Sequence, residues 1–277
     1  MNEKRATYSL KAPGPRGSSP SVRMPGRGPF PRVDDHLVEA EVTRDEIIGG
    51  HRIVASPAQP PHATQQTRID YVIQAHVAPG YRVAADLLTR HDEESDFATD
   101  VCVFKEGTDP ETGARYLEEI AFEVVSEQNA RWVNEKAVRM HRRGLRRIFT
   151  VWVKTQQVCE WSAESAGWRP LGPGALIEDP CLVAPVAVAA LLDATAADDA
   201  VVEALIAKGN PKIRRLEGQA EAKGLTEAVL EVLAARGVDA SAAQRQEILG
   251  CHDLDRLGRW LRRAALASSA GEVTSEP

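Results

Sequence analysis

Two acidic residues have the types and spacing needed for chemistry on a charged substrate. Glu123 stands inside an otherwise apolar run, IAFEVV at residues 120–125, and Asp100 precedes another apolar stretch across a turn-rich segment at 105–114. If the two stretches pair as an antiparallel hairpin, Asp100 lies opposite or diagonal to Glu123, with Cβ atoms roughly 5 Å apart. Two buried carboxylates at that distance repel each other, so the pair requires a shared proton, a cation or a basic side chain.

The helix expected over residues 130–143 supplies a candidate basic group. Trp132, Lys136 and Met140 recur every four residues and therefore share one face, which the tryptophan and the methionine indicate is buried. Lys136 on this face either reaches back to Glu123 or extends along its stem to solvent. Spacing alone slightly favours the conformation that extends to solvent.

The same helix lies in a strongly basic segment, although the whole chain has a net charge of -6. Residues 131–147 contain seven Lys or Arg residues and one acid. Phosphate-binding proteins concentrate charge in this way, whereas the alternative is a solvated helix face with a favourable C-terminal dipole. The concentration favours a polyanionic partner, and the residues expected to contact it are Arg131, Arg139, Arg142 and Arg143.

Together, the carboxylate pair, the lysine and the basic rim fit metal-assisted hydrolysis of a phosphodiester bond. Carboxylate oxygens and water are the ligands that Mg²⁺ prefers, so we expect Mg²⁺, or Mn²⁺ in its place, to be held by Asp100 and Glu123. Such a metal lowers the pKa of a bound water and neutralises developing charge. We expect Lys136 to orient the attacking water or to stabilise the pentacovalent phosphorus state.

Composition places the chain among ordinary globular proteins, with 43% hydrophobic and 27% charged residues. The four cysteines form no CxxC pair, which predicts reduced thiols. The sequence has no apolar run of transmembrane length and no apolar signal core at its start, so we expect a cytoplasmic protein without membrane contact. It also lacks P-loop, GxSxG and HExxH motifs, which argues against a P-loop NTPase, an α/β-hydrolase and that type of zinc site.

The pattern along the chain predicts three parts. Residues 1–35 are rich in Pro, Gly and Arg and predict a disordered basic tail. Residues 36–178 alternate strand and helix patterns, which predicts an α/β (α+β) domain, with the acidic cluster at 91–96 as a solvated loop. Residues 179–277 are rich in Ala and Leu and predict an all-helical C-terminal extension.

The order and spacing of these motifs resemble the PD-(D/E)XK nuclease superfamily and, more narrowly, the Uma-two family of putative restriction endonucleases. The resemblance covers about half of the chain, residues 44–162. Each motif alone is weak, whereas their order together is fairly specific. The motifs that carry the resemblance are EIIGGHRIVASP at 46–57, His62, Thr99-Asp100, Glu123-Val124-Val125-Ser126, and Glu135-Lys136 followed by Gly144.

This resemblance implies a restriction-endonuclease-like mixed central sheet flanked by helices, in a protein that acts on DNA. It implies a metal held by Asp100 and Glu123, and Lys136 as the site lysine, moved from a strand to a helix. It also implies Glu46 as an additional acidic site residue. Val125 occupies the strand position at which the superfamily often has lysine, so activity depends on Lys136 taking that place.

Two other functions stay open on the sequence. The first is a catalytically degenerate relative that binds nucleic acid or regulates, and Lys136 more than about 8 Å from both carboxylates would favour it, given a lysine reach of roughly 6 Å and a metal–oxygen bond of about 2 Å. The second is an oligomeric interaction protein without affinity for nucleic acid at any salt concentration. It would self-associate through the C-terminal helices, which resemble tails of transposase-like members of the superfamily.

Overall fold

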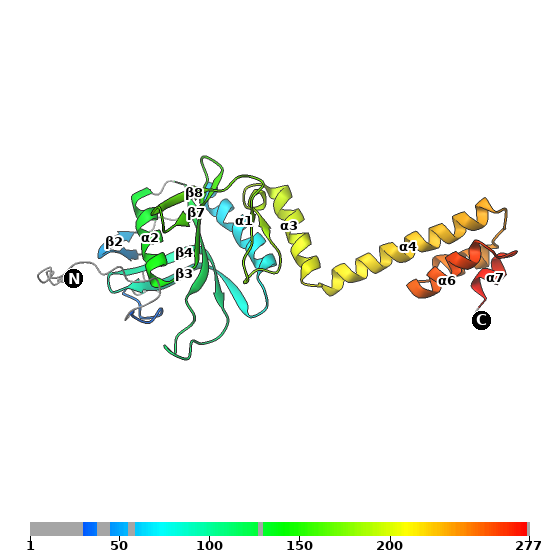
Figure 1. The fold of residues 1–277 in the computed structure, drawn as a ribbon, viewed down its shortest axis with the longest axis horizontal. Helices are drawn as coiled ribbons and strands as arrows, with labels where there is room; N and C mark the ends of the chain where they lie inside the picture. Colours follow the sequence, from blue (N-terminus) through cyan, green and yellow to red (C-terminus); the bar gives the residue numbers. More distant parts are fainter. Residues whose placement is uncertain (1–29, 38–44, 55–58, 127–129, 276–277) are drawn as a thin grey trace, which may run out of the picture.

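The chain forms a sheet-and-helix domain that a long helix connects to a smaller group of helices (Figure 1). The computed structural model describes residues 30–37, 45–54, 59–126 and 130–275. The expected basic tail lies outside these ranges except for its last six residues, 30–35.

The larger domain is built on one mixed sheet. Its strands are β1 (Asp45–Ile48), β2 (His51–Val54), β3 (Tyr81–Asp92), β4 (Ser95–Lys105), β5 (Glu118–Val125), β6 (Arg147–Trp152), β7 (Gln157–Ser162) and β8 (Gly167–Pro170). The order is β2-β1-β4-β5-β6-β7-β8, and β3 pairs with β4 off this path. Strands β5 and β6 run parallel, and the other pairs described in this sheet are antiparallel. The expected fold class is thus confirmed.

Two helices cover opposite faces of the sheet (Figure 1). Helix α1 (Pro60–His76) packs Ile69 and Ile73 into a core that includes Phe122 of β5. Helix α2 (Ala130–Arg143) packs Met140 into a second core that includes Ala121 of β5. Because successive strand residues point to opposite faces, the neighbours Ala121 and Phe122 belong to different cores.

Helix α2 is the crossover that parallel pairing of β5 and β6 requires. It ends after Arg143, where Gly144 adopts a φ of 123° and its amide donates to the Met140 carbonyl at 3.1 Å. A glycine suits this left-handed position because it has no Cβ. The crossover brings α2 back across the sheet and so determines where Lys136 lies.

The acidic cluster at 91–96 is not a solvated loop, so that prediction is wrong. Strands β3 and β4 extend into it as a hairpin in which His91, Ser95 and Asp96 are fully buried. The segment before β1 covers this hairpin, because the amide of Leu37 donates to Asp96 Oδ2 at 2.7 Å. A contact between residues so far apart in the sequence has no local signature.

The first core continues beyond residue 178, where the sequence suggested a boundary. It includes the short hairpin β9 (Leu176–Ile177) and β10 (Val186–Ala187), the 3-10 helix η1 (Val188–Leu191) and the first turns of α3 (Ala194–Ala207). Gln65 of α1 donates to the carbonyl of Leu191 at 2.5 Å. These segments therefore pack with the sheet domain.

The remaining helices form a separate small core, here called the distal module. They are α4 (Pro211–Ala235), α5 (Ala242–Leu249), α6 (Leu254–Ala264) and α7 (Ala270–Thr274). Val229, Leu233, Ile248, Leu257 and Trp260 are buried against one another within it. C-terminal helices are thus confirmed, although the segment from 179 to the first turns of α3 contains β10 and packs with the sheet domain. Among the described residues, no helix has both the length and the apolarity needed to cross a bilayer.

The first core gives a stability prediction. Phe122 is fully buried and stacks on Phe149, with ring centroids 5.1 Å apart. Replacing Phe122 with Ala leaves a cavity, which should lower the free energy of unfolding by about 3–5 kcal/mol, measured by urea denaturation. Val54→Ala, at an exposed position, should change it by less than about 0.5 kcal/mol. Equal losses in the two variants would contradict this packing.

His91 gives a prediction for pH. It is fully buried and stacks on Phe97 at 4.0 Å, and burial holds its pKa well below the ordinary value. Because the unfolded chain binds the proton more tightly, His91 should make stability fall as pH drops below about 6.5, by at most about 1.4 kcal/mol per pH unit. The cations that also oppose its protonation are Arg143, Lys136, Arg115 and Arg139. In His91→Phe, urea denaturation at pH 7.5 and 5.5 should show a smaller difference than in the wild type; an unchanged difference would contradict the prediction.

Candidate active site

The hairpin of β4 and β5 brings the two predicted carboxylates together. Val101 pairs with Phe122, so Asp100 and Glu123 are the next opposed positions in this register. Asp100 Oδ2 accepts a hydrogen bond from the Val124 amide at 2.6 Å, which fixes one carboxylate against the neighbouring strand. Glu123 is buried, with 7% of the residue exposed.

Lys136 turns inward to this pair. Its Nζ lies 3.6 Å from Glu123 Oε2 and 2.9 Å from Glu46 Oε1, and it donates to the carbonyl of Ala98 at 3.1 Å. The ammonium also lies 5.1 Å from the centroid of the Phe97 ring. The solvent-directed conformation that spacing favoured is not the one found, because two carboxylates and a carbonyl offer the ammonium closer partners.

Glu46 joins the site from β1, the strand next to the edge strand β2. Strand β1 places its Oε1 where it accepts from both Lys136 Nζ and the Ala98 amide, the latter at 3.0 Å. The hairpin turn after β1 is formed by Gly49 and Gly50, with φ values of 58° and 76° that favour glycine. The four residues expected to form the site therefore converge from β1, β4, β5 and α2.

The charges in the site are unbalanced. Burial, together with the nearby Asp100 and Glu46 carboxylates, raises the pKa of Glu123 to about 8, although Lys136 opposes the shift. Burial alone would lower the pKa of Lys136, yet the carboxylates of Glu123, Glu46 and Asp100 raise it above its ordinary value. The lysine is thus held as a cation among three acids, which is an arrangement that a further cation would stabilise.

Helix α1 adds two polar residues to the site. His62 Nε2 lies 3.5 Å from Asp100 Oδ1, and this contact raises the pKa of His62. Gln66, one turn later, donates both to the Asp100 carbonyl and to Asp86 Oδ1, each at 2.9 Å. His62 entered the sequence analysis only through the family motif, and Gln66 did not enter it. The sequence feature that could have pointed to both residues is helical spacing, which puts His62 and Gln66 on the same face of α1 as the buried Ile69.

Comparison with known proteins identifies the family. A family model described as "Uma2: Putative restriction endonuclease" matches residues 34–190, more than half of the chain. The chain belongs to the Uma2 family. A similar solved structure is described as a putative nuclease belonging to DUF820 from Anabaena variabilis ATCC 29413; it is 18% identical, the match covers 53% of this chain and 89% of that chain, and the TM-score is 0.45. No curated protein matches.

In this Uma2 member the site lysine comes from a helix. Val125, two residues after Glu123 on β5, is buried, whereas the superfamily often has lysine at that position. The ammonium of Lys136 instead approaches the carboxylates from α2. Although Val125 stands where a lysine was expected, Lys136 therefore brings an ammonium to the carboxylates of Glu123 and Glu46.

The site can be tested for its fit to a divalent metal. Glu123 Oε1 is buried and has no hydrogen-bond partner among the described residues, so a carboxylate oxygen faces the cluster without compensation. Within the same residues, no three His, Cys, Asp or Glu side chains form a ready ligand set. Mg²⁺ is commonly held by one or two carboxylates with water in its remaining positions, so two carboxylates fit it.

The four predicted DNA contacts fall into two groups. Arg139 Nη1 is bonded to Asp92 Oδ2 at 2.6 Å, and Arg143 Nη2 donates to the Pro31 carbonyl at 2.8 Å. Both are therefore engaged inside the domain. Arg131 and Arg142 are exposed on α2 and can reach a partner from solution.

The charge imbalance predicts opposite effects on stability. Glu123→Gln removes a carboxyl that is ionised in the unfolded chain at pH 7.5 and must take up a proton on burial, whereas Lys136 keeps its contact with Glu46. The free energy of unfolding at pH 7.5 should therefore rise by about 1–2 kcal/mol. Lys136→Met leaves three acids without their cation and should lower it by about 3–5 kcal/mol. Urea denaturation measures both, with the exposed Glu164→Gln as a matched control near zero. A destabilised Glu123→Gln would show that the site is not strained by excess negative charge.

Proposed function

We propose that this Uma2 member is a metal-dependent endonuclease that hydrolyses phosphodiester bonds of DNA. The observation that carries the proposal is the convergence of Asp100, Glu123 and Lys136 from two strands and a helix, around a buried carboxylate oxygen that has no hydrogen-bond partner in the described part of the chain. Burying two carboxylates beside a lysine lowers the stability of the fold, so finding them together indicates a catalytic role. Membership of the family supports the same activity.

Asp100 and Glu123 are the residues that would hold Mg²⁺ or Mn²⁺. When bound, the metal supplies an activated water at neutral pH and neutralises charge on the phosphate. The Val124 amide keeps Asp100 oriented, and His62 contacts its other oxygen. These contacts leave the carboxylate pair in place before substrate arrives, which limits reorganisation during the reaction.

Lys136 supplies positive charge where the phosphate becomes more negative. Its raised pKa keeps the ammonium protonated at neutral pH, and its contact with the Ala98 carbonyl restrains it. A fixed cation in a partly desolvated site stabilises a transition state more than a solvated one does. Glu46 acts as a positioning residue, because its Oε1 links the Lys136 ammonium to the Ala98 amide.

DNA contact is assigned to the basic residues around α2. Arg131 and Arg142 are exposed and would contact phosphates directly. Arg139 and Arg143 would act less directly, since they hold the β3–β4 hairpin and the segment at 30–31 next to the helix. A polyanionic substrate fits this distribution better than a neutral one.

Cleavage of supercoiled plasmid tests the proposal. With Mg²⁺ or Mn²⁺ the wild type should nick or linearise the plasmid, and EDTA should abolish the activity. Glu123→Gln and Lys136→Ala should each lower the rate by about 100- to 1000-fold, because each removes charge that acts on the transition state. Glu164→Gln and Lys212→Ala, at exposed positions, should cleave like the wild type.

The outcomes separate the nuclease from its alternative. Loss of cleavage in both site variants, with circular dichroism unchanged, would support the proposal. A wild type that binds DNA in a salt-dependent manner but cleaves nothing would indicate the degenerate nucleic-acid-binding relative. Cleavage that survives both substitutions would overturn the site. Self-association through the C-terminal helices stays a prediction, measurable by light scattering.

A further inference from the structure

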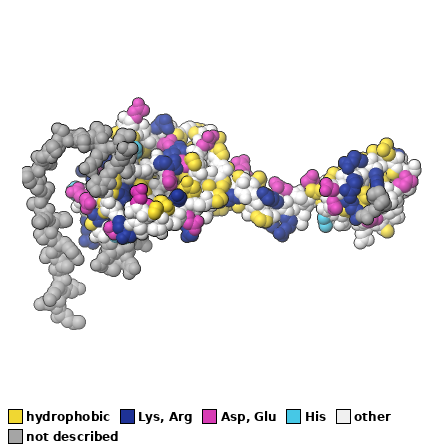
Figure 2. Space-filling view, turned by 60° about the horizontal axis from the view of Figure 1, so that its bottom comes forward, with side chains coloured by type: hydrophobic (Ala, Val, Ile, Leu, Met, Phe, Trp, Pro, Cys, Tyr) yellow, Lys and Arg dark blue, Asp and Glu magenta, His cyan; other side chains and the backbone are white. Residues whose placement is uncertain are grey.

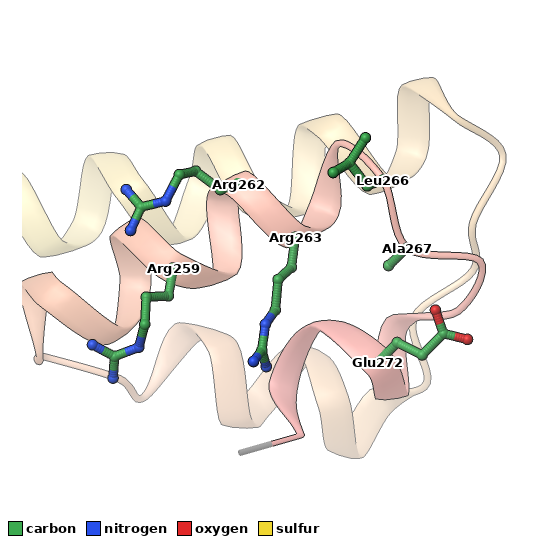
Figure 3. A pocket seen from close by; sticks show the side chains of 6 residues that line it. All are labelled: Arg259, Arg262, Arg263, Leu266, Ala267 and Glu272. Atoms are coloured by element: carbon green, nitrogen blue, oxygen red, sulfur yellow. The ribbon is translucent and has the colours of Figure 1, made fainter. Parts of the chain in front are cut away.

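The outer face of α6 in the distal module carries an unusual concentration of arginine. Arg259, Arg262 and Arg263 line an open hollow together with Leu266 and Ala267 (Figure 3). In the space-filling view, Lys and Arg side chains gather on the visible face of this module (Figure 2). Like charges three and four residues apart destabilise a helix, so helix stability does not explain the cluster.

The fold of the module presents this face to solvent. Leu257, Trp260 and Ala264 form the inner stripe of α6 and are buried in the module core. The three arginines lie outside that stripe; Arg259 and Arg262 are exposed, whereas Arg263 is half-buried and extends towards α7 (Figure 3). Because Leu257, Trp260 and Ala264 must face the module core, the arginines of α6 are placed on its other faces.

Side-chain caps define where α5 and α6 begin. Ser241 begins α5 with a capping box, and the Asp253 side chain accepts from the Arg256 amide at 3.0 Å to begin α6. Four residues, 250–253, join the two helices.

The arginines are not neutralised within the described part of the module. No carboxylate described there forms an ion pair with Arg259, Arg262 or Arg263, whereas Arg256 pairs with Glu247 at 3.8 Å. Glu272 borders the hollow, but its Oε2 accepts from the Ser268 amide at 3.0 Å. Arg263 Nη1 donates to the Ser275 carbonyl, so Arg259 and Arg262 are the cations available to a ligand.

The partner that fits this surface is a chain of phosphates. Guanidinium groups bind phosphate oxygens through planar pairs of N–H donors, and their regular helical spacing offers several such sites in a row. Leu266 is 83% exposed but isolated; a docking helix would need an apolar stripe of several residues, which this hollow does not provide. An acidic peptide is therefore a poorer fit than a nucleic-acid backbone.

We propose that the outer face of α6 is a second docking site for the sugar-phosphate backbone of duplex DNA. The choice of DNA as the polyanion rests on the proposed nuclease function. The first eleven residues of α4, 211–221, span about 16 Å and precede the part of the helix that packs in the distal module. A module tethered at that distance raises the effective concentration of DNA at the nuclease domain.

The salt dependence of DNA binding by the full chain tests this site. The probe is a fluorescent 40-base-pair duplex in EDTA, so that affinity is measured without cleavage. Each phosphate contact contributes about 0.9 to the slope of log affinity against log salt. Arg259→Gln/Arg262→Gln should reduce that slope by about 2 and weaken binding at least tenfold at low salt. The control, Lys223→Gln/Arg245→Gln, removes the same charge from exposed positions elsewhere in the module and should leave the slope unchanged.

Each outcome decides the inference. A slope lowered only by the α6 variant supports it, even if the wild type fails to cleave plasmid and the nuclease proposal falls. Equal slopes in both variants and the wild type overturn it, even if cleavage is intact. Equal losses in the two variants also overturn it, because they show a diffuse effect of charge. A change of oligomeric state in the α6 variant, by light scattering and without a change in slope, would mark an interface between protein chains instead.

Discussion

The arrangement of the larger domain depends on one buried ammonium. Lys136 lies between Glu46 on β1 and Glu123 on the central strand β5, so a single cation links β1, β5 and α2. Taking such charges out of water costs free energy that their attraction only partly restores. The strands and the crossover helix must therefore hold these groups in place through apolar packing on both faces of the sheet. The packing that holds these buried charges therefore makes the scaffold rigid and also keeps the site residues in position.

The sequence predicted the meeting of Asp100 and Glu123 because the turn-forming residues at 105–114 place the centre of the hairpin and so limit its registers. It could not predict the direction of Lys136, since the partner that draws it inward, Glu46, lies 90 residues away in the chain. The same limit explains the error at residues 91–96, whose burial comes from the segment around Leu37. Helix α2 and its end at Gly144 were predictable because they depend on local spacing and on one glycine.

Charge counts were less informative than the strand patterns. The basic segment around α2 predicted a polyanion, yet two of its four expected contacts, Arg139 and Arg143, are used to fasten neighbouring segments. A count cannot separate cations that hold a fold from cations that meet a ligand. The arginines of α6 show the converse, because their availability follows from the inner stripe of Leu257 and Trp260.

The first half of α4 has a consequence for how the two parts of the chain are oriented. Residues up to 221 of this helix lie outside the buried stripe of the distal module, which starts at Ala222. An uninterrupted helix transmits rotation as well as distance, by about 100° and 1.5 Å for each residue. Inserting two residues there would turn the distal module to nearly the opposite azimuth, whereas eighteen would restore its phase after five turns. The length of α4 therefore determines the direction in which the distal module faces relative to the sheet domain. Relatives with helices of other lengths would present the module on a different side.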